Sequence, residues 1–276
     1  IMNKRLRITL FFLGGFGNQL YTYSFGKFLS EKYNMDVSFD TSLYKTGNKK
    51  PEILNFRSSI YFKSSANIII QFRLIKYLQF LPNFISQVLI FIFSFGKYNN
   101  IIFEKNVDLG RFNIKSKKKY TKNILDNLSN LNTNKSIALY GYWQSLNLFD
   151  EFRSMLVDDI SLKNHTVTSI KMLEKIHINE NSIMLHIRGN DIADKYMDET
   201  SIDYYRKSIK YFNKNIKNSK YFVFTDDIDY AKSIIRKSKL KNYILVRDYN
   251  FSTIEEFFLM TKFRNYIVPK STFSWW

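Results

Sequence analysis

Ser182-Ile-Met-Leu-His-Ile-Arg-Gly-Asn-Asp191 begins with an apolar run that is too short for a typical helix and ends in Gly-Asn-Asp. This pattern predicts a buried strand of a parallel sheet that opens into a loop at its carboxyl end. Ligands of open α/β sheets bind at that end of the strands. Because a buried cation needs a partner, Arg188 and the neighbouring His186 indicate either a bound anion or an internal ion pair, for instance of Arg188 with Asp191.

The residues that follow alternate between short apolar runs and amphipathic segments. We expect strands at 183–188, 221–225, 243–246 and 266–268, and helices at 202–217, 229–238 and 252–262. Alternation at this spacing is typical of a parallel sheet with helices on both faces. Ser252 and Glu255 form the pattern of a capping box at the start of the last of these helices.

The N-terminal residues show the same alternation around a glycine turn. We expect a strand, a turn, a helix and a second strand at 7–13, 14–17, 18–32 and 35–39. Leu20 stands where a dinucleotide-binding fingerprint has its third glycine, so a nicotinamide cofactor is not expected. What remains is a turn at Gly15 and Gly17 that a ligand can approach closely, with the amides of Asn18 and Gln19 as donors. A glycine turn that only packs would have the same sequence.

Another expected strand, at 136–142, leads into Trp143 and Gln144. An aromatic ring packs well against the apolar face of a pyranose, and an amide can bond its hydroxyls. Trp143 and Gln144 are therefore candidate sugar-binding residues, and packing of Trp143 in the core is the alternative.

Two polar segments follow strands of the second half. Asp226 and Asp227 come after the strand at 221–225, where acids can hold a divalent cation, cap the next helix or accept hydrogen bonds from a base such as guanine. We favour the metal-free contact with a base. Hydroxyls and free amides at a helix start form an anion site, which we place at Ser271, Thr272, Phe273 and Ser274. With Arg188 at the same edge of the sheet, a diphosphate would lie between them.

The length, amino-acid composition and net charge exclude several classes of protein and of binding site. The chain of 276 residues is long enough for two domains and too apolar, at 45% hydrophobic, for disorder. It has no cysteine, which excludes disulfides and thiolate metal sites, and its three histidines are dispersed. The net charge of +18 is compatible with an anionic substrate or surface. No nucleic-acid recognition motif accompanies it, so nucleic acid is not an expected partner.

Five motifs together resemble the bacterial α-1,2-fucosyltransferases of glycosyltransferase family 11. They extend over nearly the whole chain and are Gly14 to Leu20, Gly141 to Ser145, His186 to Arg188, Phe224 to Asp227, and Ser271 to Trp276. The resemblance implies an α/β, GT-B-like fold with two Rossmann-like domains that face a cleft, at 1–160 for the acceptor and at 161–276 for GDP-fucose.

The resemblance also implies a reaction. L-fucose would pass from GDP-L-fucose, with inversion and without a metal or other cofactor, to the 2-hydroxyl of a terminal galactoside in surface polysaccharide or O-antigen (lipopolysaccharide) synthesis. Arg188 would hold the departing diphosphate, and Asp191 is the candidate general base. The other implied donor-binding residues are Gly15, Gly17, Asn18, Gln19, His186, Asp226, Asp227, Ser271, Thr272, Phe273 and Ser274, and the implied acceptor-binding residues are Trp143 and Gln144.

The chain departs from the family pattern at two places. The central motif of the family usually reads His-x-Arg-Arg-Gly-Asp, whereas Gly189 and Asn190 occupy the fourth and fifth positions here. The sequence also stops at Trp276, where the family continues, so the donor domain is expected to be incomplete at its C-terminus. A non-catalytic relative that binds a glycan or nucleotide is therefore the alternative function.

An apolar run at 84–93 is too short to span a bilayer, and a core helix is the preferred interpretation. Arg73 and Lys76 precede it, which would also suit an interfacial helix. The expected location is the cytoplasm, with peripheral contact to the inner face of the membrane as a further hypothesis and a lipid-linked glycan as a compatible acceptor.

Overall fold

The computed structural model describes residues 5–41, 44, 51–55, 62–63, 85, 98–104, 128, 136–144, 153–160, 176–189 and 200–276. The chain divides into two compact units, residues 1–163 and 164–276. Each unit has its own parallel sheet. The assignment of an acceptor role to the first unit and a donor role to the second stays a prediction.

The second unit contains a four-stranded parallel sheet in the order β8-β7-β6-β9. In chain order its elements are β6 (Ser182–Ile187), α8 (Ile202–Asn215), β7 (Lys220–Thr225), α9 (Ile228–Ser238), β8 (Tyr243–Leu245), the 3₁₀ helix η7 (Val246–Tyr249), α10 (Thr253–Met260), β9 (Asn265–Ile267) and α11 (Thr272–Trp275). The predicted alternation is thus confirmed, and Ser252 and Glu255 form the predicted capping box.

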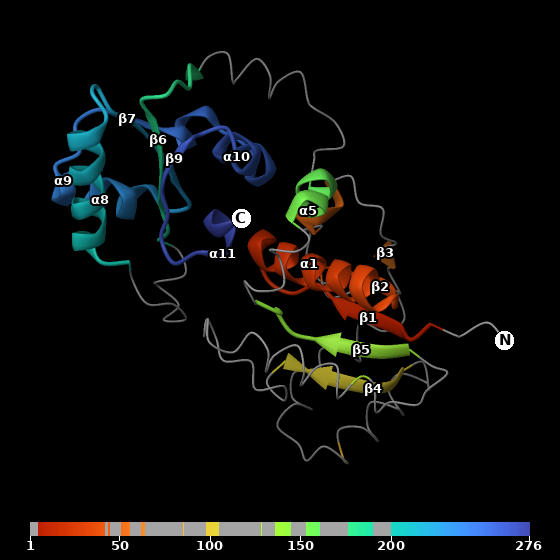
Figure 1. The fold of residues 1–276 in the computed structure, drawn as a ribbon. Helices are drawn as coiled ribbons and strands as arrows, with labels where there is room; N and C mark the ends of the chain where they lie inside the picture. The colour runs from red at the N-terminus through yellow and green to blue at the C-terminus, as the bar shows by residue number, and fades with distance from the viewer. Residues whose placement is uncertain are drawn as a thin grey trace. The chain divides into compact units, whose positions relative to one another are not determined.

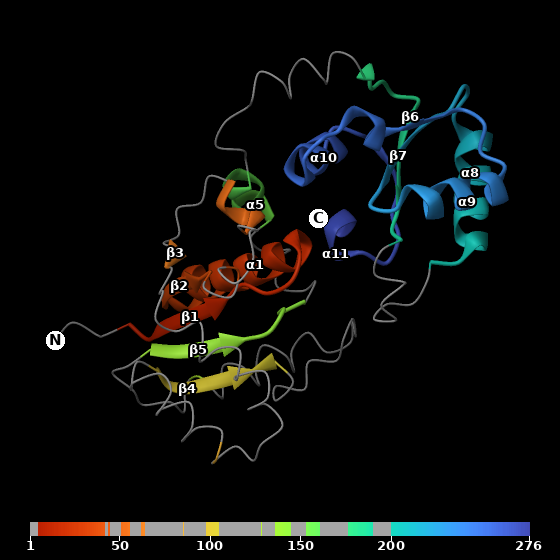
Figure 2. The ribbon, with the colours of Figure 1, turned by 180° about the vertical axis from the view of Figure 1, so that it is seen from behind.

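Helices cover both faces of this sheet because its strands are apolar on both sides. Ile183 and Leu185 of β6 face α8 and α9, whereas Met184 packs in a second cluster with Leu259 and Met260 of α10. Figures 1 and 2 show α8 and α9 on one side of the sheet and α10 on the other.

The strand order creates a switch point between β6 and β9. The chain leaves β6 through α8 to reach β7, and it reaches β9 from the opposite face through α10. Connections that diverge in this way leave a crevice at the carboxyl ends of the two strands, where open α/β sheets bind ligands. Arg188 follows β6 and Ser271 follows β9, so both candidate residues belong to this edge.

The first unit repeats the arrangement with a five-stranded parallel sheet in the order β3-β2-β1-β5-β4. Its described elements are β1 (Arg7–Phe11), α1 (Phe16–Tyr33), β2 (Asp36–Asp40), the 3₁₀ helix η2 (Glu52–Asn55), β3 (Phe62–Lys63), β4 (Tyr98–Phe103), β5 (Ser136–Tyr140) and α5 (Arg153–Asp159). Here the switch point lies between β1 and β5.

Helix α1 is buried along most of its length. A Cβ on Gly26 would lie 2.4 Å from Phe39 Cζ, so glycine allows the helix to pack closely on β2. Lys27 is also buried, and its Nζ lies 3.1 Å from Asp159 Oδ2 at the end of α5. Tyr23 donates a hydrogen bond of 2.7 Å to the same oxygen. This network compensates for the burial of the ammonium group.

No helix in the described parts of the chain has the length and apolarity needed to cross a membrane. Of the apolar run at 84–93, only Ile85 lies among the described residues.

Candidate active site

The end of β6 places a neutral imidazole beside a guanidinium. His186 is buried, and its ring lies edge-on to Phe273 of α11 at 5.9 Å between centroids. Burial and the charge of Arg188 lower the pKa of His186 to about 3, so the ring is uncharged at neutral pH. Among the described residues, none forms a hydrogen bond with the buried Nδ1 of His186.

Asp226 joins the loop after β7 to the loop after β6. Its Oδ2 lies 2.8 Å from Nη1 of Arg188, and its Oδ1 accepts a 2.8 Å hydrogen bond from the Gly189 amide. The side chain of Arg188 is 31% exposed, so the guanidinium reaches both Asp226 and the solvent at the sheet edge. Arg188 therefore forms an internal ion pair, and its partner is Asp226. Asp191, which the sequence suggested as the partner, lies outside the described residues.

Asp227 has a different position from Asp226. Its side chain accepts a 3.0 Å hydrogen bond from the Tyr230 amide and caps α9. Its backbone amide donates to the hydroxyl of Thr225, which fixes the turn. A Cβ built on Gly189 would lie 2.5 Å from the Cβ of Asp227. Asp227 thus has the capping role that competed with base recognition, and it leaves room only for glycine at position 189.

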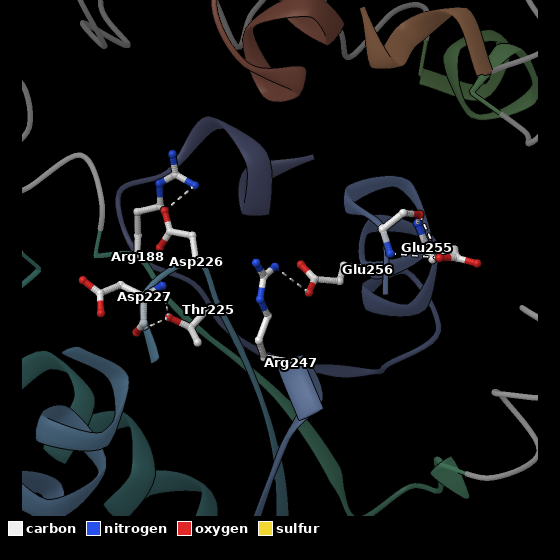
Figure 3. Close-up of polar contacts among 8 residues, drawn as sticks. Arg188, Thr225, Asp226, Asp227, Arg247, Glu255 and Glu256 are labelled. Carbon is white, nitrogen blue, oxygen red and sulfur yellow. Dashed lines mark hydrogen bonds and ion pairs between the residues drawn. The ribbon is translucent and has the colours of Figure 1, made fainter. Parts of the chain in front are cut away.

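A second ion pair, which the sequence analysis missed, lies at the same end of the sheet. Nη1 of Arg247 in η7 is 3.8 Å from Oε1 of Glu256 in α10. Figure 3 shows this pair together with the pair of Arg188 and Asp226. Glu256 is only 9% exposed. Burial raises the pKa of Glu256 to about 7, the charge of Arg247 opposes this rise, and the charge of Asp226 adds to it.

The pKa of Glu256 predicts how stability depends on pH. A carboxyl whose folded-state pKa lies above its unfolded value stabilises the fold below the unfolded pKa, and this contribution is lost as pH rises to about 7. A shift of this size corresponds to roughly 3 kcal/mol. The free energy of unfolding of Glu256→Gln should therefore be close to that of the parent at pH 4.5 and exceed it by up to this amount above pH 7.

Denaturant titrations of both proteins at several pH values would measure this difference. Glu180→Gln is the matched control because Glu180 is exposed. A pH-independent difference for Glu256→Gln would show that Glu256 ionises normally.

The loop after β9 brings the last candidate residues to the crevice. Ser271 is the N-cap of the short helix α11, and no described residue donates a hydrogen bond to its side chain as a cap. Thr272, Phe273 and Ser274 follow and are half-buried. Phe273 contacts both His186 and Phe257, which anchors α11 on the sheet and on α10. The structure therefore brings the segment 271–274 to the strand end that carries His186.

Two ion pairs lie at this edge of the sheet, Arg188 with Asp226 and Arg247 with Glu256. Within the described ranges, no group of three or more histidines and acids could hold a metal ion. Absence of a metal requirement stays a prediction. What the arrangement offers is cationic groups and backbone amides around a crevice, which suits a diphosphate.

In the first unit, the candidate residues of the glycine turn occupy different environments. Gly15 is exposed, and a Cβ there would meet nothing within 4 Å, whereas Gly17 is buried in α1. Gln19 is fully buried, accepts a hydrogen bond from the Ile53 amide and donates to Glu52 at 2.9 Å. Gln19 therefore holds η2 against α1. Asn18 is half-buried and accepts a 2.7 Å hydrogen bond from Gln144.

Trp143 does not face the solvent. Its ring is fully buried and stacks on Phe25 of α1 at 4.7 Å between centroids. In this structure the ring cannot serve as the sugar platform considered above, because packing in the core uses its faces. Tyr142, the other aromatic residue of this turn, is 42% exposed.

The chain is similar to known glycosyltransferases. A sequence model of glycosyl transferase family 11 matches residues 8–276. An α-1,2-colitosyltransferase from Escherichia coli is 26% identical over 95% of this chain and 83% of its own length. The O-antigen biosynthesis glycosyltransferase WbnK from Escherichia coli is 29% identical over 50% of this chain and 49% of its own length.

Among solved structures, the fucosyltransferase NodZ from Bradyrhizobium has a similar fold. It superposes with a TM-score of 0.56 at 12% identity, and the match covers 98% of this chain and 92% of NodZ. A structure of NodZ, an α-1,6-fucosyltransferase, soaked with GDP-fucose gives a TM-score of 0.51. These matches agree with the predicted GT-B-like α/β fold.

Proposed function

The chain belongs to glycosyltransferase family 11, and we propose that it transfers L-fucose from GDP-L-fucose to the 2-hydroxyl of a terminal galactoside. The product would be an α-1,2-linked fucose in a surface polysaccharide such as O-antigen. The similarity to WbnK supports the polysaccharide, and the fold shared with a fucosyltransferase that was soaked with GDP-fucose supports the donor.

One observation carries this proposal. Arg188 follows β6 and the helix start at Ser271 follows β9, and these two strands are neighbours at the switch point. In the proposed reaction the bond from the anomeric carbon of fucose to the diphosphate breaks, and the acceptor oxygen attacks from the opposite face. Arg188 and the amides of residues 271–274 would neutralise the charge that develops on the departing GDP.

The nucleotide base would lie deeper in the crevice. The buried Nδ1 of His186 offers a hydrogen-bonding group toward a ligand there, and Asp226 offers a carboxylate at the same edge. We assign the contact with guanine to these two residues, while Asp227 would act mainly through the turn that it caps. Gly15 and Asn18 would line the donor side of the first unit without a metal or cofactor, whereas Gly17 is buried in α1 and would act only through the turn.

The proton of the acceptor hydroxyl must pass to a base or to water. Asp191 is the candidate because it follows Arg188 in the central motif, and it lies outside the described residues. A highly dissociative transition state needs little basic assistance, because the acceptor oxygen attacks late. The expected loss of rate in Asp191→Asn is therefore smaller than the loss in an Arg188 variant.

One of the relatives favours a second candidate donor. The α-1,2-colitosyltransferase of Escherichia coli aligns with 95% of this chain. Colitose is L-fucose without its 3-hydroxyl, so the same diphosphate and guanine contacts would bind GDP-colitose. Only contacts with the sugar ring would separate the two donors.

A transfer assay tests the proposed function. The protein would be incubated in EDTA with GDP-fucose, GDP-colitose or GDP-mannose and with a series of β-galactosides, and products would be identified by mass spectrometry and NMR. We expect α-1,2-fucosylated galactoside from GDP-fucose and no transfer from GDP-mannose. If product forms from GDP-colitose and not from GDP-fucose, the donor is GDP-colitose. Binding of GDP-fucose without turnover would identify a non-catalytic relative.

The cellular setting would follow from this function. Nucleotide sugars for surface polysaccharides are made in the cytoplasm, so we propose that location, with a galactose-terminated and lipid-linked glycan as the partner. Peripheral attachment to the inner membrane is part of the proposal and would appear as sedimentation with anionic vesicles at low salt.

A further inference from the structure

The first unit has a polar contact across its own switch point. Asn18 follows β1 in the first turns of α1, and Gln144 follows β5. The amide of Gln144 donates a 2.7 Å hydrogen bond to Asn18, which joins the two loops that border the crevice. By the rule that applies to the second unit, a ligand is expected at this edge as well.

Glu104, at the end of β4, fixes the turn after β5. Its Oε2 accepts a hydrogen bond of 2.6 Å from the Tyr142 amide, and its Oε1 accepts one of 3.1 Å from the Trp143 amide. A Cβ on Gly141 would lie 2.4 Å from the Cβ of Glu104, so only glycine allows this approach. One carboxylate thus binds two consecutive backbone amides.

The result is a turn with one buried and one exposed aromatic ring. Trp143 has a left-handed backbone conformation with a φ of 55°, which is uncommon for a bulky residue. The two hydrogen bonds that Glu104 accepts from this turn compensate for the cost of that conformation. The ring of Trp143 enters the core, and the ring of Tyr142 stays 42% exposed.

Gly14 places the exposed ring beside the amide of Asn18. A Cβ built on Gly14 would lie 3.1 Å from Cε1 of Tyr142 and 2.7 Å from Nδ2 of Asn18. Gly14 also has a φ of +65°, so a glycine suits this position for two reasons. An aromatic face bordered by side-chain amides is the combination that recognises a pyranose.

We infer that Tyr142 is the stacking platform for the acceptor sugar and that Glu104 is the residue that positions it. This inference rests on the proposed function, because it assigns the pyranoside acceptor to the first unit. Gln144, which is held by its hydrogen bond to Asn18, bonds hydroxyls of the stacked sugar, and Trp143 supports the turn from within the core.

Variants of Tyr142 test the platform. Tyr142→Ala should raise the KM for the galactoside about tenfold with the Kd of GDP-fucose unchanged, because only the stacking surface is lost. Tyr142→Phe keeps the ring and should behave like the parent. Tyr211→Ala is the matched control, since Tyr211 is 62% exposed on α8, and it should have no effect on acceptor KM. An unchanged acceptor KM in Tyr142→Ala would overturn the inference.

Glu104→Gln tests the positioning role. Glutamine has one acceptor oxygen in place of two, and its NH₂ group would face a backbone amide. We expect acceptor KM to rise about tenfold, as in Tyr142→Ala, and the double variant Glu104→Gln/Tyr142→Ala to add little further, because the two residues act as one unit. Independent, multiplying effects would contradict the positioning role.

A binding measurement separates this inference from the proposed function. Saturation-transfer NMR with methyl β-galactopyranoside reports binding without turnover. Binding that is lost in Tyr142→Ala supports the platform even if no fucose is transferred. Transfer of fucose with equal galactoside binding in the parent and in Tyr142→Ala refutes the platform and keeps the function. Failure of both measurements would refute both.

Discussion

Replacing Arg188 by alanine should lower kcat/KM for GDP-fucose about 10³-fold, the loss expected when a group that stabilises a leaving oxyanion is removed. Arg188 lies at the carboxyl end of β6, and its side chain is 31% exposed. In the variant, the charge that builds on the departing diphosphate would no longer face a cation at this position. Calorimetric titration of GDP-fucose should show a matching loss of donor affinity.

Controls distinguish this catalytic loss from damage to the fold. Arg188→Ala leaves Asp226 without the guanidinium that lies 2.8 Å away, so Arg188→Ala/Asp226→Asn removes both charges. The double variant should recover stability but not activity. Arg206→Ala removes an exposed arginine that lies 3.3 Å from Asp203, and its kcat/KM should equal that of the parent. Activity within threefold of the parent in Arg188→Ala would exclude the proposed role.

Restoring the second arginine of the family motif, by Gly189→Arg, should reduce stability and activity instead of increasing them. Any Cβ at this position would lie 2.5 Å from the Cβ of Asp227, which caps α9. Relief of the clash must move the cap or the Gly189 amide that donates to Asp226. We expect a cost of about 2 kcal/mol in unfolding free energy from overpacking and a donor affinity that is lower about tenfold.

Two further variants test whether the Cβ clash at position 189 causes the loss of stability. Gly189→Ala should show the same loss of stability, because the clash begins at the Cβ. Gly15→Ser is the matched stability control, since a Cβ on Gly15 meets nothing within 4 Å and serine is a good N-cap. Its unfolding free energy should change by less than about 0.5 kcal/mol. Higher transfer activity and an unchanged Tm in Gly189→Arg would show that the loop accommodates the arginine.

The parallel sheet of the second unit could be predicted because its signals are local. Apolar runs, amphipathic segments and the capping box of Ser252 and Glu255 each depend on residues close in sequence. The position of the candidate site followed, because the carboxyl ends of parallel strands meet at one edge.

The partners of the site residues could not be predicted in the same way. Arg188 pairs with Asp226, which comes from the next strand, and a sequence pattern carries no distance between two strands. Arg247 and Glu256 were missed for this reason, since one lies in a short 3₁₀ helix and the other on the buried face of α10. A glutamate among the apolar residues of that helix was the only local signal.

In the first unit, the backbone conformation of Trp143 could not be predicted from the strand pattern that precedes it. The alternation of a strand does not predict which of the rings of Tyr142 and Trp143 is exposed, because Trp143 has a left-handed backbone conformation. That conformation depends on Glu104, which follows another strand, β4. The buried amide of Gln19 likewise has partners in η2, which the helix-start pattern did not reveal.

Hydrogen exchange measured by mass spectrometry, with and without GDP-fucose, tests the donor site most directly. Bound GDP-fucose should slow amide exchange in three peptides, 183–189, 222–228 and 269–276. The first two contain the ends of β6 and β7 with the residues that follow them, and the third contains α11. The protection should be absent with GDP-fucose in Arg188→Ala and present in Arg206→Ala. Protection confined to the first unit, or none in these three segments at a concentration of GDP-fucose that supports transfer, would contradict a donor site at this edge of the second sheet.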